Sequence, residues 1–221
     1  MKISKGNIVS NRAIVLVFLA TQENEFYNIF SEIEMNYKIE IMEILQFIKG
    51  SENDLNAWVK NCKKYLVELS QRYNEIILVG YGIGSILAGN CAVLPFIKKV
   101  ILLEPKYEYF SNLEYKNECY EREFMREVAS LGINKNLFSI IFLRLVESLE
   151  SQIRLSSAKV IIIQRIEDSS ITTARIDRLY LTIDRDNFTV IRLGLKETSL
   201  FASENSRAIT LLLLRYHLKT N

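Results

Sequence analysis

Histidine is almost absent from this 221-residue sequence, which contains a single one, His217. A serine or cysteine nucleophile needs an imidazole to take up and return its proton, so this chain has only one residue for that role. His217 stands far along an apolar C-terminal stretch of helical character, Leu211-Leu-Leu-Leu-Arg-Tyr-His-Leu218. We therefore expect it at the surface or at a helix end, away from any catalytic centre.

Cysteine and long apolar runs are also scarce. Cys62, Cys91 and Cys119 are an odd number without metal-ligand spacing, which indicates free thiols in a reducing compartment and no metal site. The apolar run Ala13–Ala20 is too short to cross a bilayer, and Phe18 stands where a signal-peptide cleavage site needs a small residue. We expect a cytoplasmic protein without a membrane span.

Excess charge of one sign is missing too. The chain has 28 basic and 26 acidic residues, a net charge of +2, which gives no electrostatic reason to expect a nucleic-acid partner. An apolar share of 49% and a charged share of 24% are typical of a globular protein. The length predicts one α/β domain over residues 1–221, and no pattern indicates a cofactor.

Strand and helix patterns alternate along most of the chain. Apolar or alternating runs predict strands at Ala13–Ala20, Ile39–Ile44, Ile76–Val79, Lys99–Glu104, Lys159–Ile163 and Phe188–Leu193. Helical spacing predicts helices at about 26–35, 55–69, 83–94, 173–181 and 203–218, and a helical insertion at 106–157. Strands that alternate with helices indicate a mostly parallel sheet with helices on both faces.

A glycine turn stands at the centre of this pattern. The apolar run Ile76–Val79 leads into Gly80-Tyr-Gly-Ile-Gly84, and an apolar helical segment follows. Strand, sharp turn and helix are the architecture of a nucleophile elbow, which reads G-x-S-x-G. In this sequence Gly82 occupies the position of the serine.

Three stretches in this order resemble the α/β-hydrolase superfamily. Gly80–Gly84 resembles the elbow, Val100–Pro105 the strand that follows it, and Val160–Ile171 the strand and loop that carry the triad acid. The similarity in layout extends from Ala13 to the C-terminus, with residues 106–157 in place of the family's cap. The resemblance implies an α/β-hydrolase-like fold with a helical cap insertion.

The family's catalytic triad matches this chain at one position of three. The acid falls on Asp168, the nucleophile on Gly82, and the place of the histidine is taken by Lys196 or Glu197. The loop expected to stabilise an oxyanion is Thr21-Gln-Glu-Asn-Glu25, which is bulky and acidic and would oppose a developing negative charge. The resemblance therefore implies a member of the superfamily with a degenerate triad, and it favours a non-enzymatic role over an enzymatic one.

Two functions follow from a hydrolase-like fold without its triad. The first is a binding or scaffolding protein for a partner protein or a small acyl or peptide ligand, held in a pocket near Thr21, Tyr81 and Ser85. The second is an esterase- or thioesterase-like hydrolase that uses unconventional groups such as Ser85, Asp168 or Lys196. Asp168 also fits a solvated turn or a helix cap, Ser85 a hydrogen bond in the first turn of the helix, and Tyr81 aromatic packing.

A nucleotide-binding enzyme is a third interpretation of the same turn. Gly80 and Gly82 follow a strand and open a helix, and Glu104 ends the next strand, where an acidic residue binds a ribose hydroxyl in dinucleotide-binding folds. The third glycine of that motif is replaced by Ser85. The sequence leaves the ligand, the partner and the oligomeric state open.

Overall fold

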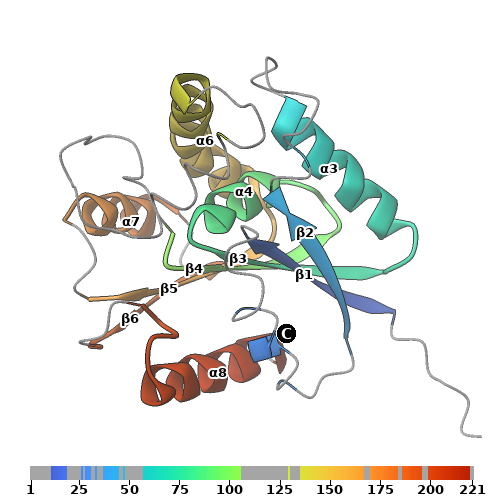
Figure 1. The fold of residues 1–221 in the computed structure, drawn as a ribbon. Coiled ribbons are helices and arrows are strands. Elements are labelled where there is room, and N and C mark those ends of the chain that lie inside the picture. The colour runs from blue at the N-terminus through green and yellow to red at the C-terminus, as the bar shows by residue number, and fades with distance from the viewer. Residues whose placement is uncertain are drawn as a thin grey trace, which may run out of the picture.

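Six parallel strands form one sheet in the computed structural model of the chain, in the order β2-β1-β3-β4-β5-β6 (Figure 1). The strands are β1 (Arg12–Phe18), β2 (Lys38–Glu43), β3 (Glu75–Tyr81), β4 (Ile97–Leu103), β5 (Lys159–Arg165) and β6 (Phe188–Leu193). The helices are α3 (Ala57–Ser70), α4 (Ile83–Cys91), α6 (Lys135–Leu155), α7 (Ser170–Thr182) and α8 (Glu204–Lys219). The structure describes residues 11–18, 26, 28–30, 33, 37–44, 47, 57–105, 129, 135–166, 170–183, 186–195 and 199–219.

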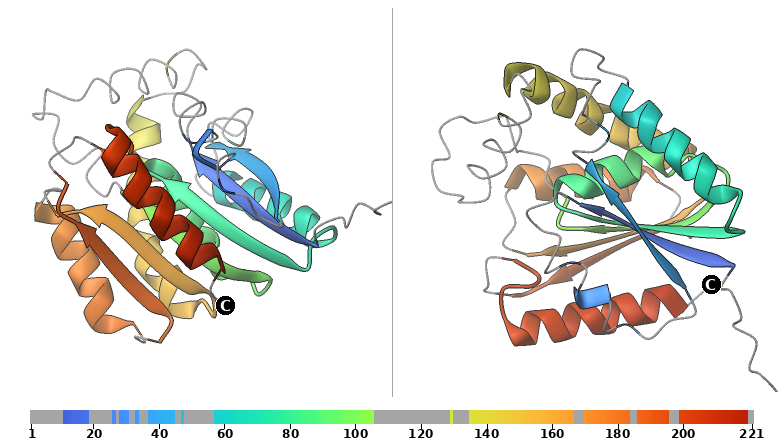
Figure 2. Two further views of the ribbon diagram at one scale, coloured as in Figure 1. Left: turned by 90° about the horizontal axis from the view of Figure 1, so that it is seen from below. Right: turned by 45° about the vertical axis from the view of Figure 1, so that its right-hand side comes forward.

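Helices cover both faces of this sheet. Helices α3, α4, α6 and α7 lie on one face and α8 lies on the other, as the views in Figures 1 and 2 show. The inner strands are buried on nearly every residue, which explains why their sequences are continuous apolar runs rather than alternating ones. The predicted α/β class, with a parallel sheet wrapped on both faces, is confirmed.

The side chains of each strand alternate between two apolar cores. Leu78 and Leu102 point into the core under α3, α4, α6 and α7, whereas Ile77 and Ile101 point into the core under α8. Because side chains along a strand point to opposite faces with a period of two, this division fixes the register of the sheet.

Helix α6 lies within the predicted insertion 106–157. The predicted helical spacing of Phe138, Ile141, Leu145 and Leu149 is confirmed, and all four side chains are buried. Asn90 of α4 donates from Nδ2 to the carbonyl oxygen of Leu145 at 2.9 Å, so α6 packs on α4 within the helical layer. Residues 106–128 and 130–134 lie outside the described residues, and the cap there stays a prediction.

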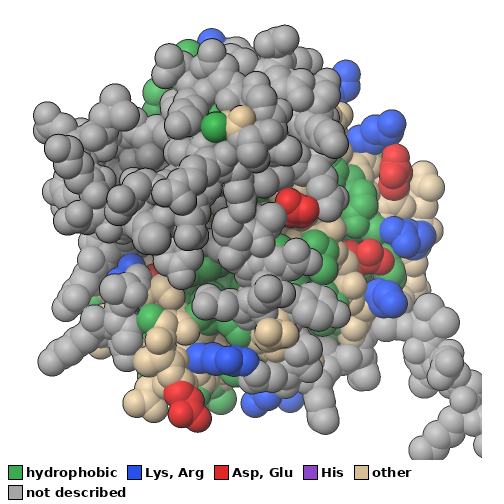
Figure 3. Space-filling model, in the orientation of Figure 1, with side chains coloured by type: hydrophobic (Ala, Val, Ile, Leu, Met, Phe, Trp, Pro, Cys, Tyr) green, Lys and Arg blue, Asp and Glu red, His purple; other side chains and the backbone are tan. Residues whose placement is uncertain are grey.

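Charged side chains of both signs are interspersed on the face seen in Figure 3, among the residues that are coloured there. That distribution agrees with the small net charge of +2. Among the described residues, no helix is both long enough and apolar enough to cross a membrane.

Candidate functional site

The predicted elbow is a strand–turn–helix with its sharp bend at Gly82. Strand β3 ends at Tyr81, α4 begins at Ile83, and Gly82 between them has φ 57° and ψ −118°. The Gly82 amide donates to the carbonyl oxygen of Leu103 at 2.9 Å, which ties the bend to the end of β4. A positive φ costs a residue with a side chain about 1–3 kcal/mol, so glycine holds this conformation with less strain than the serine of an elbow would.

The two glycines that flank the bend are required by close backbone contacts. A Cβ atom at Gly84 would lie 2.0 Å from the carbonyl oxygen of Val17 in β1, and one at Gly80 would lie 2.6 Å from the carbonyl oxygen of Gly84. Real Cβ atoms essentially never approach that closely. The bend therefore has the strand–turn–helix backbone of a nucleophile elbow, with Gly82 at its centre.

Ser85 lies buried beneath this bend. Its Oγ is 2.8 Å from the carbonyl oxygen of Gly80 and 2.9 Å from that of Leu103, and the residue is 0% exposed. A hydroxyl has one hydrogen, so Oγ donates to one of these carbonyls at a time. Ser85 thus links β3 to β4 and offers no accessible oxygen to a substrate.

Tyr81 belongs to a group of aromatic rings on the α8 side of the sheet. Its ring stacks on Phe26 with centroids 5.7 Å apart and meets Phe201 edge-on at 5.1 Å. Offset and edge-to-face pairs at these distances are favourable packing arrangements. Tyr81 is therefore a packing residue, and it contacts both Phe26, which follows β1, and Phe201, which precedes α8.

Glu104 forms a buried ion pair one residue after the end of β4. It is 2% exposed, its Oε1 accepts from Nε of Arg165, and its Oε2 accepts from the Leu200 amide at 3.3 Å. Its φ of 44° is in the left-handed region, which non-glycine residues adopt at a cost. A ribose hydroxyl would have to compete with these contacts, so the geometry does not favour the nucleotide-binding interpretation.

Gln164 is a buried polar residue near the carboxyl end of β5. It is 0% exposed, and among the described residues neither Nε2 nor Oε1 has a hydrogen-bond partner. An unpartnered buried amide costs about 1–3 kcal/mol, a cost that a bound water or ligand would relieve. Sequence reasoning missed it, although a glutamine directly after Val160–Ile163 interrupts an apolar run.

His217 lies at the opposite edge of the sheet from the elbow. Its carbonyl oxygen accepts from Nζ of Lys99 near the start of β4, whereas Gly82 is bonded to Leu103 at the end of that strand. Of the two predicted alternatives, a surface position or a helix end, the helix end is confirmed, and the residue is only 8% exposed. The last turn of α8 packs His217 on the sheet beside Leu214 and Leu218, which are buried as well.

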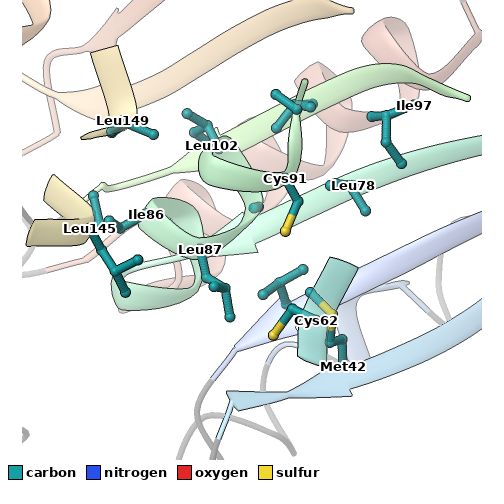
Figure 4. Close-up of a cluster of buried hydrophobic side chains, with 14 of the residues drawn as sticks. Met42, Cys62, Leu78, Ile86, Leu87, Cys91, Ile97, Leu102, Leu145 and Leu149 are labelled. Carbon is teal, nitrogen blue, oxygen red and sulfur yellow. The ribbon is translucent and has the colours of Figure 1, made fainter. Parts of the chain in front are cut away.

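Cys62 and Cys91 are free and buried in the apolar layer between the sheet and its helices (Figure 4). Burial raises the pKa of the Cys91 thiol to about 12, and burial also raises the pKa of Cys62. Because the thiolate is the nucleophile, neither thiol is activated for attack at neutral pH.

Several predicted site residues lie outside the described residues. These are Thr21 in the oxyanion loop, Asp168 at the triad acid position, and Lys196 and Glu197 at the histidine position. The third cysteine, Cys119, lies outside them as well. Within the described part of the chain, no group of three or more histidine, cysteine, aspartate or glutamate residues could hold a metal ion.

Solved structures share the architecture built up above. A monoacylglycerol lipase from Paleococcus ferrophilus superposes with a TM-score of 0.60 at 10% identity, over 92% of this chain and 94% of the lipase. One of the metagenome-derived lipolytic enzymes LipS and LipT gives a TM-score of 0.66 at 11% identity, over 96% of this chain and 95% of that chain. The chain has an α/β-hydrolase fold.

A carboxylesterase of the thaumarchaeon Nitrososphaera gargenis gives a similar result, with a TM-score of 0.65 at 12% identity over 94% of this chain and 90% of that chain. No family model matches the sequence, and no curated protein matches it either. At these identities the likeness shows the α/β-hydrolase fold alone, because one fold supports many chemistries.

Proposed function

We propose that this chain is a non-catalytic α/β-hydrolase-like protein that binds a small apolar, acyl-type ligand. The observation that carries the proposal is Gly82, a residue without a side chain at the bend of an otherwise intact elbow. His217 supports it, because the only imidazole of the chain is packed at the other edge of the sheet. Without a nucleophile and a base, acyl transfer loses several orders of magnitude in rate.

The esterase alternative is favoured by the lipases and carboxylesterases that share the fold. We expect no turnover of p-nitrophenyl acetate, butyrate or octanoate above the rate in buffer, for the natural protein and for Gly82→Ser alike. The variant regains an oxygen but still lacks an imidazole near it, and the positive φ costs it about 1–3 kcal/mol of stability. Saturable turnover by the natural protein would overturn the non-catalytic proposal.

A small apolar cavity beside the elbow supports the choice of an apolar ligand. Its volume is about 10 Å³, and it lies where α3, α4 and α6 meet. Among the described residues its lining is entirely apolar: Ile44, Phe47, Trp58, Cys62, Ile83, Leu87, Phe138, Phe142 and Leu145. Nε1 of Trp58 is buried and has no hydrogen-bond partner among the described residues.

Binding at this cavity is measurable through Trp58, the only tryptophan in the chain. Titration with decanoate should produce a saturable change in Trp58 emission, as the acyl chain enters beside the indole ring. A cavity of this size holds about one water, so the ligand must displace side chains and the affinity should be modest. Leu87→Phe should weaken binding by filling the cavity, and the volume-conserving Leu87→Met should retain it.

A linear, non-saturating change in emission, or an equal response of Leu87→Phe and Leu87→Met, would contradict the acyl-ligand half of the proposal. The ester assay tests the absence of catalysis separately, so a failure to bind decanoate would not affect that part of the proposal.

A further inference from the structure

A groove lies at the amino ends of strands β1, β3, β4 and β5, at the opposite edge of the sheet from Gly82. Its volume is about 600 Å³, within the range of small-molecule binding sites. It is lined by Asn11, Arg12, Asn74, Glu75, Lys98, Lys99, Lys159 and Leu218. The elbow and the apolar cavity use other residues, so this groove is independent of the function proposed above.

Among the described residues, the groove lining has four cationic side chains and one carboxylate. Glu75 forms an ion pair with Arg12 at 3.0 Å, and its charge also acts on Lys99. No carboxylate of the described residues lies within ion-pairing distance of Lys98 or Lys159. The groove therefore carries an excess of positive charge.

Two of these lysines stand directly opposite each other. Lys99 of β4 and Lys159 of β5 are paired in the register of the two strands. Ile101 and Ile161, two residues further along, lie in the core under α8, so both lysines are on that face of the sheet. Like charges directly opposite on neighbouring strands destabilise a sheet. Burial, followed by the charge of Lys159, lowers the pKa of Lys99, which is 6% exposed.

A structural role explains Lys99 in part. Its Nζ donates to the carbonyl oxygen of His217 in the last turn of α8, where a cation satisfies a terminal carbonyl and complements the helix dipole. That bond does not explain why a second lysine, Lys159, stands beside the first. Nor does it give a partner to Nδ1 of His217, which is buried and has no hydrogen-bond partner among the described residues.

His217 lies close enough to both lysines to respond to their charge. Burial lowers the pKa of His217, and the charges of Lys159 and Lys99 lower it further. An anion bound between the two ammonium groups would offset the repulsion between them and reduce their effect on the imidazole. His217 is thus an internal reporter for an occupied groove.

We infer that this groove binds the phosphate group of a small phosphorylated molecule, with Lys99 and Lys159 supplying its counter-charge. A doubly charged phosphate matches two adjacent lysines better than a single carboxylate does, and lysine serves as a point-charge phosphate ligand. The polar side chains Asn11 and Asn74 and the apolar Leu218 line the remainder of the groove and contact the rest of the molecule.

The test follows the proton NMR signal of His217, which is unambiguous because the chain has one histidine. Glycerol 3-phosphate is added at constant ionic strength in chloride, and the pKa of His217 is measured at each concentration. We expect a saturable rise in this pKa. Lys159→Gln should weaken binding at least about tenfold, the effect of losing a charged hydrogen bond. Lys60→Gln, at an exposed position on α3, should leave it unchanged.

Two further measurements distinguish a small phosphorylated molecule from inorganic phosphate and from a lipid headgroup. Inorganic phosphate should bind more weakly than glycerol 3-phosphate, and vesicles of phosphatidylglycerol and phosphatidylcholine should not bind the protein. No saturable rise in the pKa, an equal effect in Lys159→Gln and the natural protein, equal affinity for the two phosphates, or binding to the vesicles would each overturn the inference.

Discussion

Replacing Gly84 with alanine is expected to destabilise the protein by about 3 kcal/mol or more, the range of severe overpacking. The new Cβ would lie 2.0 Å from the oxygen and 2.6 Å from the carbon of the Val17 carbonyl. Both are backbone atoms of β1, which pairs with β2 and β3 and cannot move without disturbing both ladders. The strain must therefore be relieved by displacing the start of α4.

Urea unfolding measures this effect, and a thermal shift of roughly 6–12 °C should accompany it in a domain of this size. Gly194→Ala is the matched control, because the nearest heavy atom to its Cβ would be Cδ1 of Ile166 at 3.7 Å, an ordinary contact. The control should stay within about 0.5 kcal/mol of the natural protein. Equal stabilities for the two variants would contradict the close contact between the elbow and β1.

Glu104→Gln is expected to cost about 3–5 kcal/mol, because it leaves Arg165 without its buried carboxylate. The side chains of Glu104 and Arg165 are 2% and 11% exposed, so water compensates little for the lost partner. The Leu200 amide would also lose its charged acceptor. The change should loosen the attachment of the segment before α8 to the end of β4.

A double-mutant cycle in urea separates the ion pair from its surroundings. Arg165→Met alone should destabilise the protein because Glu104 loses its partner, and Glu104→Leu alone should do so because Arg165 loses its carboxylate. The double variant Glu104→Leu/Arg165→Met should recover most of the loss. Surface pairs contribute about 0–1 kcal/mol, and the exposed pair of Arg154 with Glu150 serves as the comparison. A cost below about 1 kcal/mol for Glu104→Gln would show that the pair is not buried as described.

The order of strands and helices could be predicted from the sequence because each element carries its own local pattern. Val100–Leu103 is apolar on every residue, as a strand covered on both faces requires, and helix α6 repeats apolar residues every three or four positions. The turn at Gly82 was predictable for a similar reason. Glycines at alternate positions between an apolar strand and a helix are typical of a sharp strand-to-helix bend.

Contacts between distant residues could not be predicted in this way. Glu104 and Arg165 are 61 residues apart and meet only because β4 and β5 are neighbours in the sheet. The burial of His217 could not be predicted, because it depends on which face of α8 packs on the sheet. The cluster of lysines at the amino edge likewise arises from register, which places Lys99 beside Lys159.

Intact-mass spectrometry after incubation with a fluorophosphonate tests whether this protein has an activated serine nucleophile. This reagent adds covalently to a serine that is activated for attack. Because Gly82 has no side chain and Ser85 is buried and bonded to backbone carbonyls, we predict an unchanged mass while a serine esterase in the same tube is labelled. A stoichiometric adduct on the natural protein, lost in Ser85→Ala, would contradict it.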